Sequence, residues 1–498
     1  MLGIERHYID IGDRLVHYRA AGHGPPIILI HQSPKTSEEL VPLIHALSGH
    51  NRVIAPDTPG YGLSDPLNRR DKKLSIDDFV DALAELIDAL GLTKPGIFGS
   101  HSGAIMGVRL AIQHPDKVGC LIANGILINT AKERAELADN YFPRFEPQWD
   151  GSHLSELWSR IKDQHIFYPW YQRTTRYRIN WPASNQDYAK TALDLLEAGD
   201  FYIDAYRAVL TYDISPDLQK LALPTCLLVA KTDALSQYVE HYPTLTKHTK
   251  VELVEGPDDI TDAAAQYFRS NMPSTAGTAS KHPGAVPSKQ FVTLDDGIVH
   301  VESRAVASQK GVILVLHELG ECGALALASV SPHYPETTLI APDLPGHGET
   351  EHPAVTPYQV ASTLGLLIDA LNIDEPITII GFSQSYAYGE ILADLIRQPS
   401  VRLIAFNQDK KPCESRPPTY DNGGYHSLQA DTGGAYLHLA WHTLRDRLIA
   451  TYDAIESNDP EFSYEQPLVL QRQLIALLKA SAALPRMQRM LQKTQIIA

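Results

Sequence analysis

The residue with the clearest chemical potential is His101, which lies at the centre of a Gly-Ser-His-Ser-Gly sequence at residues 99–103. Residues 96–99 predict a short strand and residues 104–111 predict a helix, so the five residues form a sharp corner between them. Such a corner directs its middle side chain into the space above a sheet, whereas Ser100 and Ser102 are out of phase and point elsewhere. An imidazole in this place is expected to act as a general acid or base and, less readily, as a covalent acyl carrier.

The elements that must position His101 are alternating strands and helices. Helical patterns such as residues 76–90 separate the apolar runs, so a parallel sheet covered by helices on both faces is predicted. Residues 130–215 interrupt the alternation with a helical, aromatic-rich insertion, which predicts a cap over the corner; its rings are equally suited to packing the cap on the sheet. The apolar runs that predict strands are residues 26–30, 52–56, 96–99, 119–123, 225–230 and 250–254.

The second half of the chain repeats motifs of the first half. The sequence at 27–34 matches 312–320, the sequence at 53–62 matches 339–348, and the corner recurs at 381–385 with Ser383 at its centre. Fixed order with small gaps indicates two copies of one fold. We expect a complete domain over residues 1–270, a Pro/Gly/Ser/Thr-rich linker over 271–289, and a truncated copy with a helical end over 290–498, which lacks the last two strands.

Taken together, these motifs resemble the α/β-hydrolase fold family. The resemblance rests on His31 followed by Pro34, on the Asp-Thr-Pro-Gly-Tyr-Gly sequence that begins at Asp57, and on the corner at 99–103. It implies a doubly wound, mostly parallel sheet with a helical cap, duplicated in this chain. It also implies an oxyanion hole built from the backbone N–H groups of Gln32 and Ser102. His31 and Asp57 are expected to shape loops.

The chain departs from the family pattern in two linked places, of which the first is the corner, where His101 stands in the position of the family's nucleophile. The family's acid follows the seventh strand, which implies Asp233, but the family's histidine after the eighth strand is missing from residues 251–259. That loop carries Asp258 and Asp259 instead. We therefore predict that His101 pairs with Asp258 or Asp259, with Asp233 nearby, and that this pair is a general acid/base. The alternative is that the two loop aspartates form only a turn or a helix N-cap.

Three functions are compatible with these residues. The first is an enzyme that acts on a small apolar or aromatic carbonyl or ester compound by hydrolysis or a lyase-type step. The second is a binding protein with a decayed corner. The third is a serine hydrolase that uses Ser383 with a histidine from 426, 438 or 442, although Glu318 matches Gln32 and would oppose an oxyanion. Dehalogenase and epoxide hydrolase activities are disfavoured, since those relatives need an aspartate at the corner.

Composition restricts the partners. The formal net charge is −16 without a basic cluster, which argues against nucleic acid and anionic membranes. The four cysteines are far apart, and neither a signal sequence nor an apolar segment of membrane-spanning length is found, so a cytoplasmic protein is expected. No phosphate-binding glycine loop or metal-ligand spacing is present, so we predict no cofactor and no metal. The expected partner is a small-molecule substrate, and the sequence is compatible with a homo-oligomer.

Overall fold

The structure is a computed structural model in which the chain divides into two compact units. The first unit comprises Met1–Phe145 and Glu156–Ala285, and the second comprises Glu146–Ser155 and Val286–Ala498. Most of the predicted linker, at 278–287, lies outside the described residues. The structure describes residues 3–68, 73–179, 181–277, 288–306, 311–396, 401–406, 412–413, 428–454 and 466–497.

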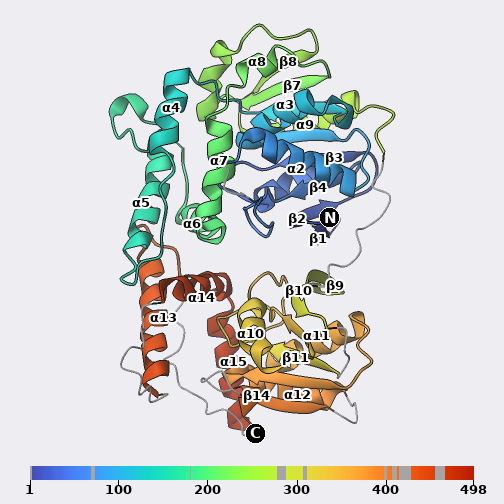
Figure 1. The fold of residues 1–498 in the computed structure, drawn as a ribbon, viewed down its shortest axis with the longest axis vertical. Helices are drawn as coiled ribbons and strands as arrows, with labels where there is room; N and C mark the ends of the chain where they lie inside the picture. Colours follow the sequence, from blue (N-terminus) through green and yellow to red (C-terminus); the bar gives the residue numbers. More distant parts are fainter. Residues whose placement is uncertain are drawn as a thin grey trace. The chain divides into compact units, whose positions relative to one another are not determined.

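The first unit is built on an eight-stranded sheet (Figure 1). The strand order is β1-β2-β4-β3-β5-β6-β7-β8; β2 is antiparallel to both of its neighbours and all the other pairs are parallel. The strands are β1 (Glu5–Asp10), β2 (Leu15–Ala21), β3 (Pro26–Ile30), β4 (Arg52–Pro56), β5 (Gly96–Ser100), β6 (Cys120–Asn124), β7 (Thr225–Ala230) and β8 (Thr249–Val254).

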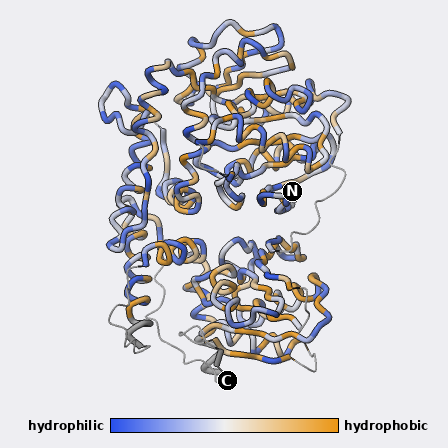
Figure 2. Tube along the Cα trace, in the orientation of Figure 1, coloured by the Kyte–Doolittle hydropathy of each residue, from blue (hydrophilic) through white to orange (hydrophobic). Residues whose placement is uncertain are grey.

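Helices cover both faces of this sheet, as predicted. On one face, α1 (Val41–Leu47) and α9 (Pro257–Asn271) share a hydrophobic core with the strands. On the other face, α2 (Ile76–Ala89) packs beside α3 (Ser102–Gln113), which contacts β5 and β6. All five residues of β3 are buried, as expected for a central parallel strand. Figure 2 shows the corresponding concentration of hydrophobic residues along the strands.

The aromatic insertion forms a helical cap on the first unit. It contains α4 (Ala131–Asn140), α5 (Ser152–Ile166), α6 (Asn185–Ala198), α7 (Tyr202–Leu210) and the short α8 (Ser215–Leu218). Helix α7 contacts α2 and α3, which joins the cap to the sheet domain. The predicted fold class, a doubly wound and mostly parallel sheet with a helical cap, is confirmed.

The second unit contains a seven-stranded sheet with a related strand order. It reads β9-β10-β12-β11-β13-β14-β15, so its first six positions follow the order of β1 to β6 in the first unit. The short β15 is antiparallel to β14, and no further parallel strand follows β14 in the residues the structure describes. The strands are β9 (Lys289–Leu294), β10 (Gly297–Arg304), β11 (Val312–Leu316), β12 (Thr338–Pro342), β13 (Ile377–Phe382), β14 (Arg402–Phe406) and β15 (Pro412–Cys413).

Helices complete the second unit. A buried Trp441 on α13 (Ala435–Ala454) donates a hydrogen bond from Nε1 to the Trp149 carbonyl oxygen over 3.0 Å, and its ring centroid lies 4.7 Å from that of His153. The helices are α10 (Gly323–Val330), α11 (Pro357–Ala370), α12 (Tyr386–Ile396), α13 (Ala435–Ala454), α14 (Pro467–Ala480) and α15 (Leu484–Ile497). Across the described ranges of the chain, none of the helices combines the length and apolar character needed to cross a bilayer.

Candidate active site

The corner between β5 and α3 has the geometry that the glycine spacing predicts. His101 has φ 46° and ψ −104°, a conformation that side-chain-bearing residues rarely adopt. The glycines allow it, because a Cβ at Gly99 would lie 2.2 Å from the Gly103 oxygen and one at Gly103 would lie 2.3 Å from the Ile30 oxygen. The histidine is thus held at the end of the central strand, at the start of a helix.

His101 is paired with Asp233, which follows β7. The distance from His101 Nε2 to Asp233 Oδ2 is 2.7 Å, and both side chains are about one-fifth exposed. The backbone N–H of Leu235 donates to the other carboxylate oxygen of Asp233 over 2.8 Å, which fixes the orientation of the carboxylate. The pair is therefore short, largely buried and charge-assisted.

The two groups shift each other's pKa in opposite directions. Burial opposes the charged imidazolium, but the Asp233 carboxylate outweighs it and raises the pKa of His101 above its ordinary value. Burial also opposes the charged carboxylate, and the His101 imidazole outweighs this effect and lowers the pKa of Asp233. The pair thus retains an ionised acid beside a more basic imidazole.

The pairing fixes which ring nitrogen of His101 is available for chemistry. Asp233 accepts the Nε2 hydrogen, which leaves the lone pair of the neutral ring on Nδ1. Nδ1 has no hydrogen-bond partner in the described part of the chain, and His101 lines a cavity. Gly125 gives the ring its space: it has φ +73°, and a Cβ there would lie 2.5 Å from His101 Cδ2. The sequence analysis did not identify Gly125.

The expected pairing of His101 with Asp258 or Asp259 is wrong. Both aspartates are exposed at the start of α9, and Asp259 Oδ2 accepts the Gly256 N–H over 2.9 Å. The loop after β8 turns directly into this helix, so its acidic residues stay at the helix N-terminus, where they complement the helix dipole. The alternative of a helix cap, also drawn from the sequence, describes Asp259 correctly.

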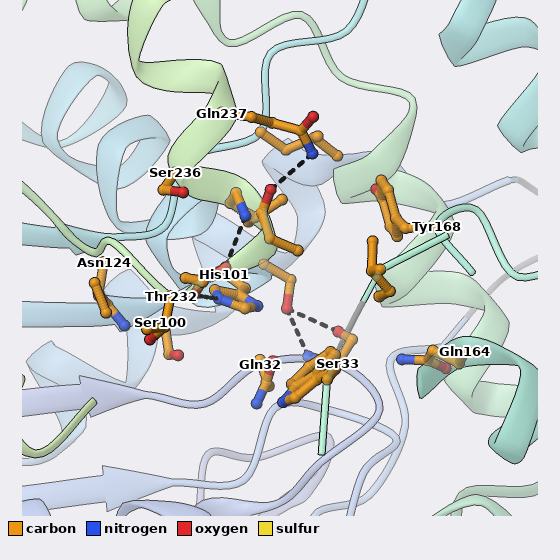
Figure 3. A pocket seen from close by; sticks show the side chains of 18 of the residues that line it. Gln32, Ser33, Ser100, His101, Asn124, Gln164, Tyr168, Thr232, Ser236 and Gln237 are labelled. Atoms are coloured by element: carbon orange, nitrogen blue, oxygen red, sulfur yellow. Dashed lines mark hydrogen bonds and ion pairs between the residues drawn. The ribbon is translucent and has the colours of Figure 1, made fainter. Parts of the chain in front are cut away.

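The cavity beside His101 has a volume of about 950 Å³ and lies between the sheet and the cap. Figure 3 shows Gln32 and Ser33 on one side of His101 and Ser236 and Gln237 on the other. The Trp181 ring centroid lies 6.5 Å from that of His101. The cap supplies Tyr141, Gln164, Tyr168, Arg178, Ile179, Trp181, Pro182, Tyr206, Val209 and Leu210 to its walls. A hollow of this size and character suits a small, partly aromatic molecule.

The predicted oxyanion hole is only half present. The Gln32 backbone N–H already donates to Glu39 Oε1 over 2.7 Å, and the Gln32 side chain donates to Oε2 over 2.9 Å. This amide therefore cannot serve a substrate in this structure, and the prediction for Gln32 is corrected: a carboxylate seven residues further along the chain satisfies the donor. No motif in the sequence points to Glu39 in this role.

The second predicted donor, the Ser102 N–H, lies at the first position of α3. Among the described residues it has no acceptor, as is usual for the first amides of a helix, and Ser102 lines the cavity. The Ser102 hydroxyl accepts the Ser33 N–H over 2.6 Å and donates to the Ser33 hydroxyl over 3.0 Å. Of the two predicted amides, that of Ser102 is thus the one whose donor is unused among the described residues, and it belongs to a residue that lines the cavity.

His31 and Asp57, which the family resemblance assigns to loop shaping, hold their loops by hydrogen bonds. His31 Nδ1 donates to the Gln32 carbonyl over 2.9 Å, and His31 Nε2 accepts the Thr58 N–H over 2.9 Å. The buried Asp57 accepts from His17 Nδ1 over 2.7 Å and from the Ser37 N–H over 2.7 Å. Every nitrogen of His31 is therefore committed to the loop, so it cannot transfer protons.

In the second unit, Ser383 follows β13 with φ 41°, so the corner geometry is present there too. No hydrogen bond joins its hydroxyl to a histidine among the described residues. His438 Nε2 pairs with the Ser155 hydroxyl over 2.8 Å, and His426 lies outside the described residues. Burial raises the pKa of Glu318, with Arg447 acting against it. In the ranges that the structure describes, no three His, Cys, Asp or Glu side chains gather as a metal site would require.

Comparison with known proteins found a family model that matches part of the first unit, residues 25–259. They match the model described as the alpha/beta hydrolase fold. A haloalkane dehalogenase of Mycolicibacterium paratuberculosis is 36% identical over 153 residues, which cover 28% of this chain and 50% of that protein. An (E)-2-((N-methylformamido)methylene)succinate hydrolase of Acinetobacter baylyi is 33% identical over 123 residues, or 24% and 46%.

The chain thus spans about half the length of the curated relatives that it matches. Among solved structures, an epoxide hydrolase of Vigna radiata is 19% identical with a TM-score of 0.41, and the match covers 54% of this chain and 98% of that one. The fold is that of the α/β hydrolases, and the second sheet is consistent with a further domain of related topology.

Proposed function

We propose that the first unit is an enzyme in which His101 is the general acid/base and Asp233 orients it. The observation that carries this proposal is the 2.7 Å pair between His101 Nε2 and Asp233 Oδ2 in the wall of a 950 Å³ cavity. A strained corner residue with a shifted pKa beside such a cavity is a typical catalytic arrangement. The substrate is a small apolar or aromatic compound with a carbonyl or ester group.

The reaction begins at Nδ1 of His101, the nitrogen that Asp233 leaves free. In a hydrolysis, Nδ1 takes a proton from water, whose oxygen attacks the carbonyl carbon; in a lyase-type step, it takes a proton from the substrate itself. The imidazolium that forms is stabilised by the Asp233 carboxylate. Negative charge on the carbonyl oxygen is stabilised by the Ser102 N–H and by the positive end of the α3 dipole. The imidazolium then returns its proton to the leaving group.

Turnover of a panel of esters, lactones and 1,3-diketones by the native chain and by H101A tests this function. We expect the H101A variant to lose about 100-fold or more of kcat/KM, the usual contribution of general acid/base catalysis. The S100A variant is the matched control, since Ser100 lines the same cavity on the same corner. Full turnover by H101A would refute the proposal.

A ligand-binding protein without catalysis is the second candidate, and Glu39 favours it. By occupying the Gln32 amide, Glu39 removes one of the two donors that an anionic intermediate would need. This function predicts that compounds of the panel raise the melting temperature of the native chain and of H101A equally, while none of them is consumed.

A serine hydrolase centred on Ser383 is a third candidate, favoured by the positive φ of Ser383 at the end of β13. A fluorophosphonate probe should then label the native chain but not S383A. Absence of labelling removes this candidate.

We also propose that the second unit is a copy of the first fold through β14, as the repeated motifs predict. Two matching networks support it. His300 Nδ1 pairs with Asp343 Oδ2 over 2.8 Å, as His17 does with Asp57, and the Leu344 N–H donates to His317 Nε2 over 2.8 Å. The role of this unit is proposed to be structural. A chain truncated after residue 285 that loses solubility or melts earlier would support that role.

A further inference from the structure

A positive charge is buried in the cap without an acidic partner. Arg160, on α5, is only 2% exposed, and its side-chain Nε and Nη2 have no hydrogen-bond partner. No carboxylate of the described residues forms an ion pair with it. Arginine is rarely buried unless it is paired, because removing the charge from water is costly. Such a group points to a partner that is not part of the chain.

Two aromatic rings compensate Arg160 only in part. Its guanidinium lies 5.7 Å from the centroid of the Tyr141 ring and 5.8 Å from that of Trp170. Contacts with ring faces stabilise a cation, but they leave the N–H donors in the guanidinium plane unused. Arg160 therefore keeps a positive charge that no carboxylate of the described residues neutralises, and this charge attracts an anion bound nearby.

Arg160 is connected to the cavity through Gln164. Arg160 Nη1 donates to Gln164 Oε1, and both Gln164 and Tyr141 line the cavity. With its oxygen held by Arg160, the side-chain amide of Gln164 is left with its NH₂ group for other partners. Figure 3 shows this nitrogen directed into the cavity. Arg160 therefore fixes Gln164 as a hydrogen-bond donor toward the cavity and adds positive charge behind it.

A second guanidinium lines the same cavity. Arg178 is exposed, contributes to the wall, and forms no ion pair with a described carboxylate. The acidic groups on the sheet side are already engaged, because Asp233 is bound to His101 and Glu39 is bound to Gln32. The cap wall thus carries unpaired positive charge, although the chain as a whole is strongly acidic.

We propose that the cap wall of this cavity binds a carboxylate of the substrate, with Arg178 and the Gln164 amide as direct donors and Arg160 as the positioning charge. The substrate class is then an aromatic or apolar carboxylate that presents a second carbonyl group to His101. Only the identification of this ligand as a substrate rests on the proposed function. Recognition of the carboxylate does not depend on catalysis.

Calorimetric titration of the full chain with naphthalene-2-acetate and with the neutral naphthalene-2-acetamide tests the proposal. Charge-assisted hydrogen bonds should make the carboxylate bind at least about 10-fold more tightly than the amide. R160M and R178Q should each reduce this preference to about 3-fold or less. The matched control is R173M, because Arg173 also lies over Trp170, at 5.7 Å, but is exposed and paired with Asp163; it should keep the preference.

Equal affinity of the native chain for both compounds would overturn the proposal, as would a preference that survives in both R160M and R178Q. Arg178 is exposed, so R178Q provides the test even where R160M does not fold. The H101A variant separates the two proposals: it should bind naphthalene-2-acetate with the native preference. That preference together with full turnover by H101A would refute the catalytic function and leave carboxylate recognition supported.

Discussion

Replacing Asp233 by asparagine tests the catalytic pair most directly. The substitution keeps the size of the side chain but removes the charge that lies 2.7 Å from His101 Nε2. Burial, which opposes the imidazolium, then acts on His101 with only the weaker attraction of Glu39 left to offset it. We therefore expect the pKa of His101 to fall, so that the acid limb of kcat/KM moves to lower pH.

The size of the rate effect follows from the geometry. A hydrogen bond to a charged group contributes about 1.5–3 kcal/mol, and the partial exposure of both side chains places this pair in the lower half of that range. Since each 1.36 kcal/mol corresponds to a factor of ten, D233N should reduce the rate by about 10- to 45-fold at its own pH optimum. An asparagine amide can also hold the ring in the other tautomer, which would increase the loss.

The same pair predicts how stability depends on pH. The raised pKa of His101 stabilises the fold below pH 6.5, and this contribution is lost as the pH rises through the folded-state pKa. The lowered pKa of Asp233 stabilises the fold above pH 3.8, and this contribution is lost as the pH falls through the folded-state pKa. The melting temperature of the native chain should thus exceed that of D233N most clearly near pH 5.5, and less at pH 8.5.

The assays are pH profiles of kcat/KM, thermal melts at the two pH values, and an NMR titration of the His101 imidazole, assigned by its absence in H101A. An acid limb that stays in place in D233N would refute the reasoning. So would a melting difference that is larger at pH 8.5 than at pH 5.5.

Three further substitutions have defined outcomes. G125A should displace the catalytic imidazole, since the new Cβ would lie 2.5 Å from it, and should lower kcat/KM about 10-fold or more, whereas G199A, also at positive φ but in open space, should only lower the melting temperature. E39A should destabilise the fold by about 1.5–3 kcal/mol, measured by denaturant unfolding. It should also free the Gln32 N–H, which would then stabilise an anionic intermediate and increase the rate of the step that forms it. D57N should cost about 1.5–3 kcal/mol by the same unfolding measurement, because it removes the charged acceptor of hydrogen bonds from the buried His17 and from the Ser37 N–H; loss of turnover without destabilisation would contradict the loop role.

Much of the fold was predictable because local patterns determine it. Apolar runs such as β3 and β7 are short and bounded, so they predict buried parallel strands directly. The corner at His101 was predictable for the same reason: two glycines at fixed spacing permit one tight approach of strand and helix, which the contacts of Gly99 and Gly103 confirm. The family resemblance then placed Asp233 after β7.

The partner of His101 could not be derived from residue types alone. Three aspartates follow the last two strands of the first sheet, and the choice among them depends on where each loop leaves the sheet. Asp233 lies three residues beyond the end of β7, whereas Gly256 and Pro257 start α9 at once and keep Asp259 on the helix end. The two hydrogen bonds from Gln32 to the Glu39 carboxylate could not be predicted, because no sequence pattern marks a carboxylate that accepts from a nearby backbone amide.

The proton-transfer role proposed for His101 determines how the first unit would respond to covalent reagents. An imidazole that only shuttles protons leaves the reacting compound unattached, so each cycle runs in one stage, without a first-turnover burst of product and without sharing an acyl group between water and added alcohols. Mechanism-based inhibitors that react with a nucleophilic hydroxyl group should therefore not inactivate the first unit. Reversible ligands that match the aromatic rings and the charge of the cavity are more suitable inhibitors.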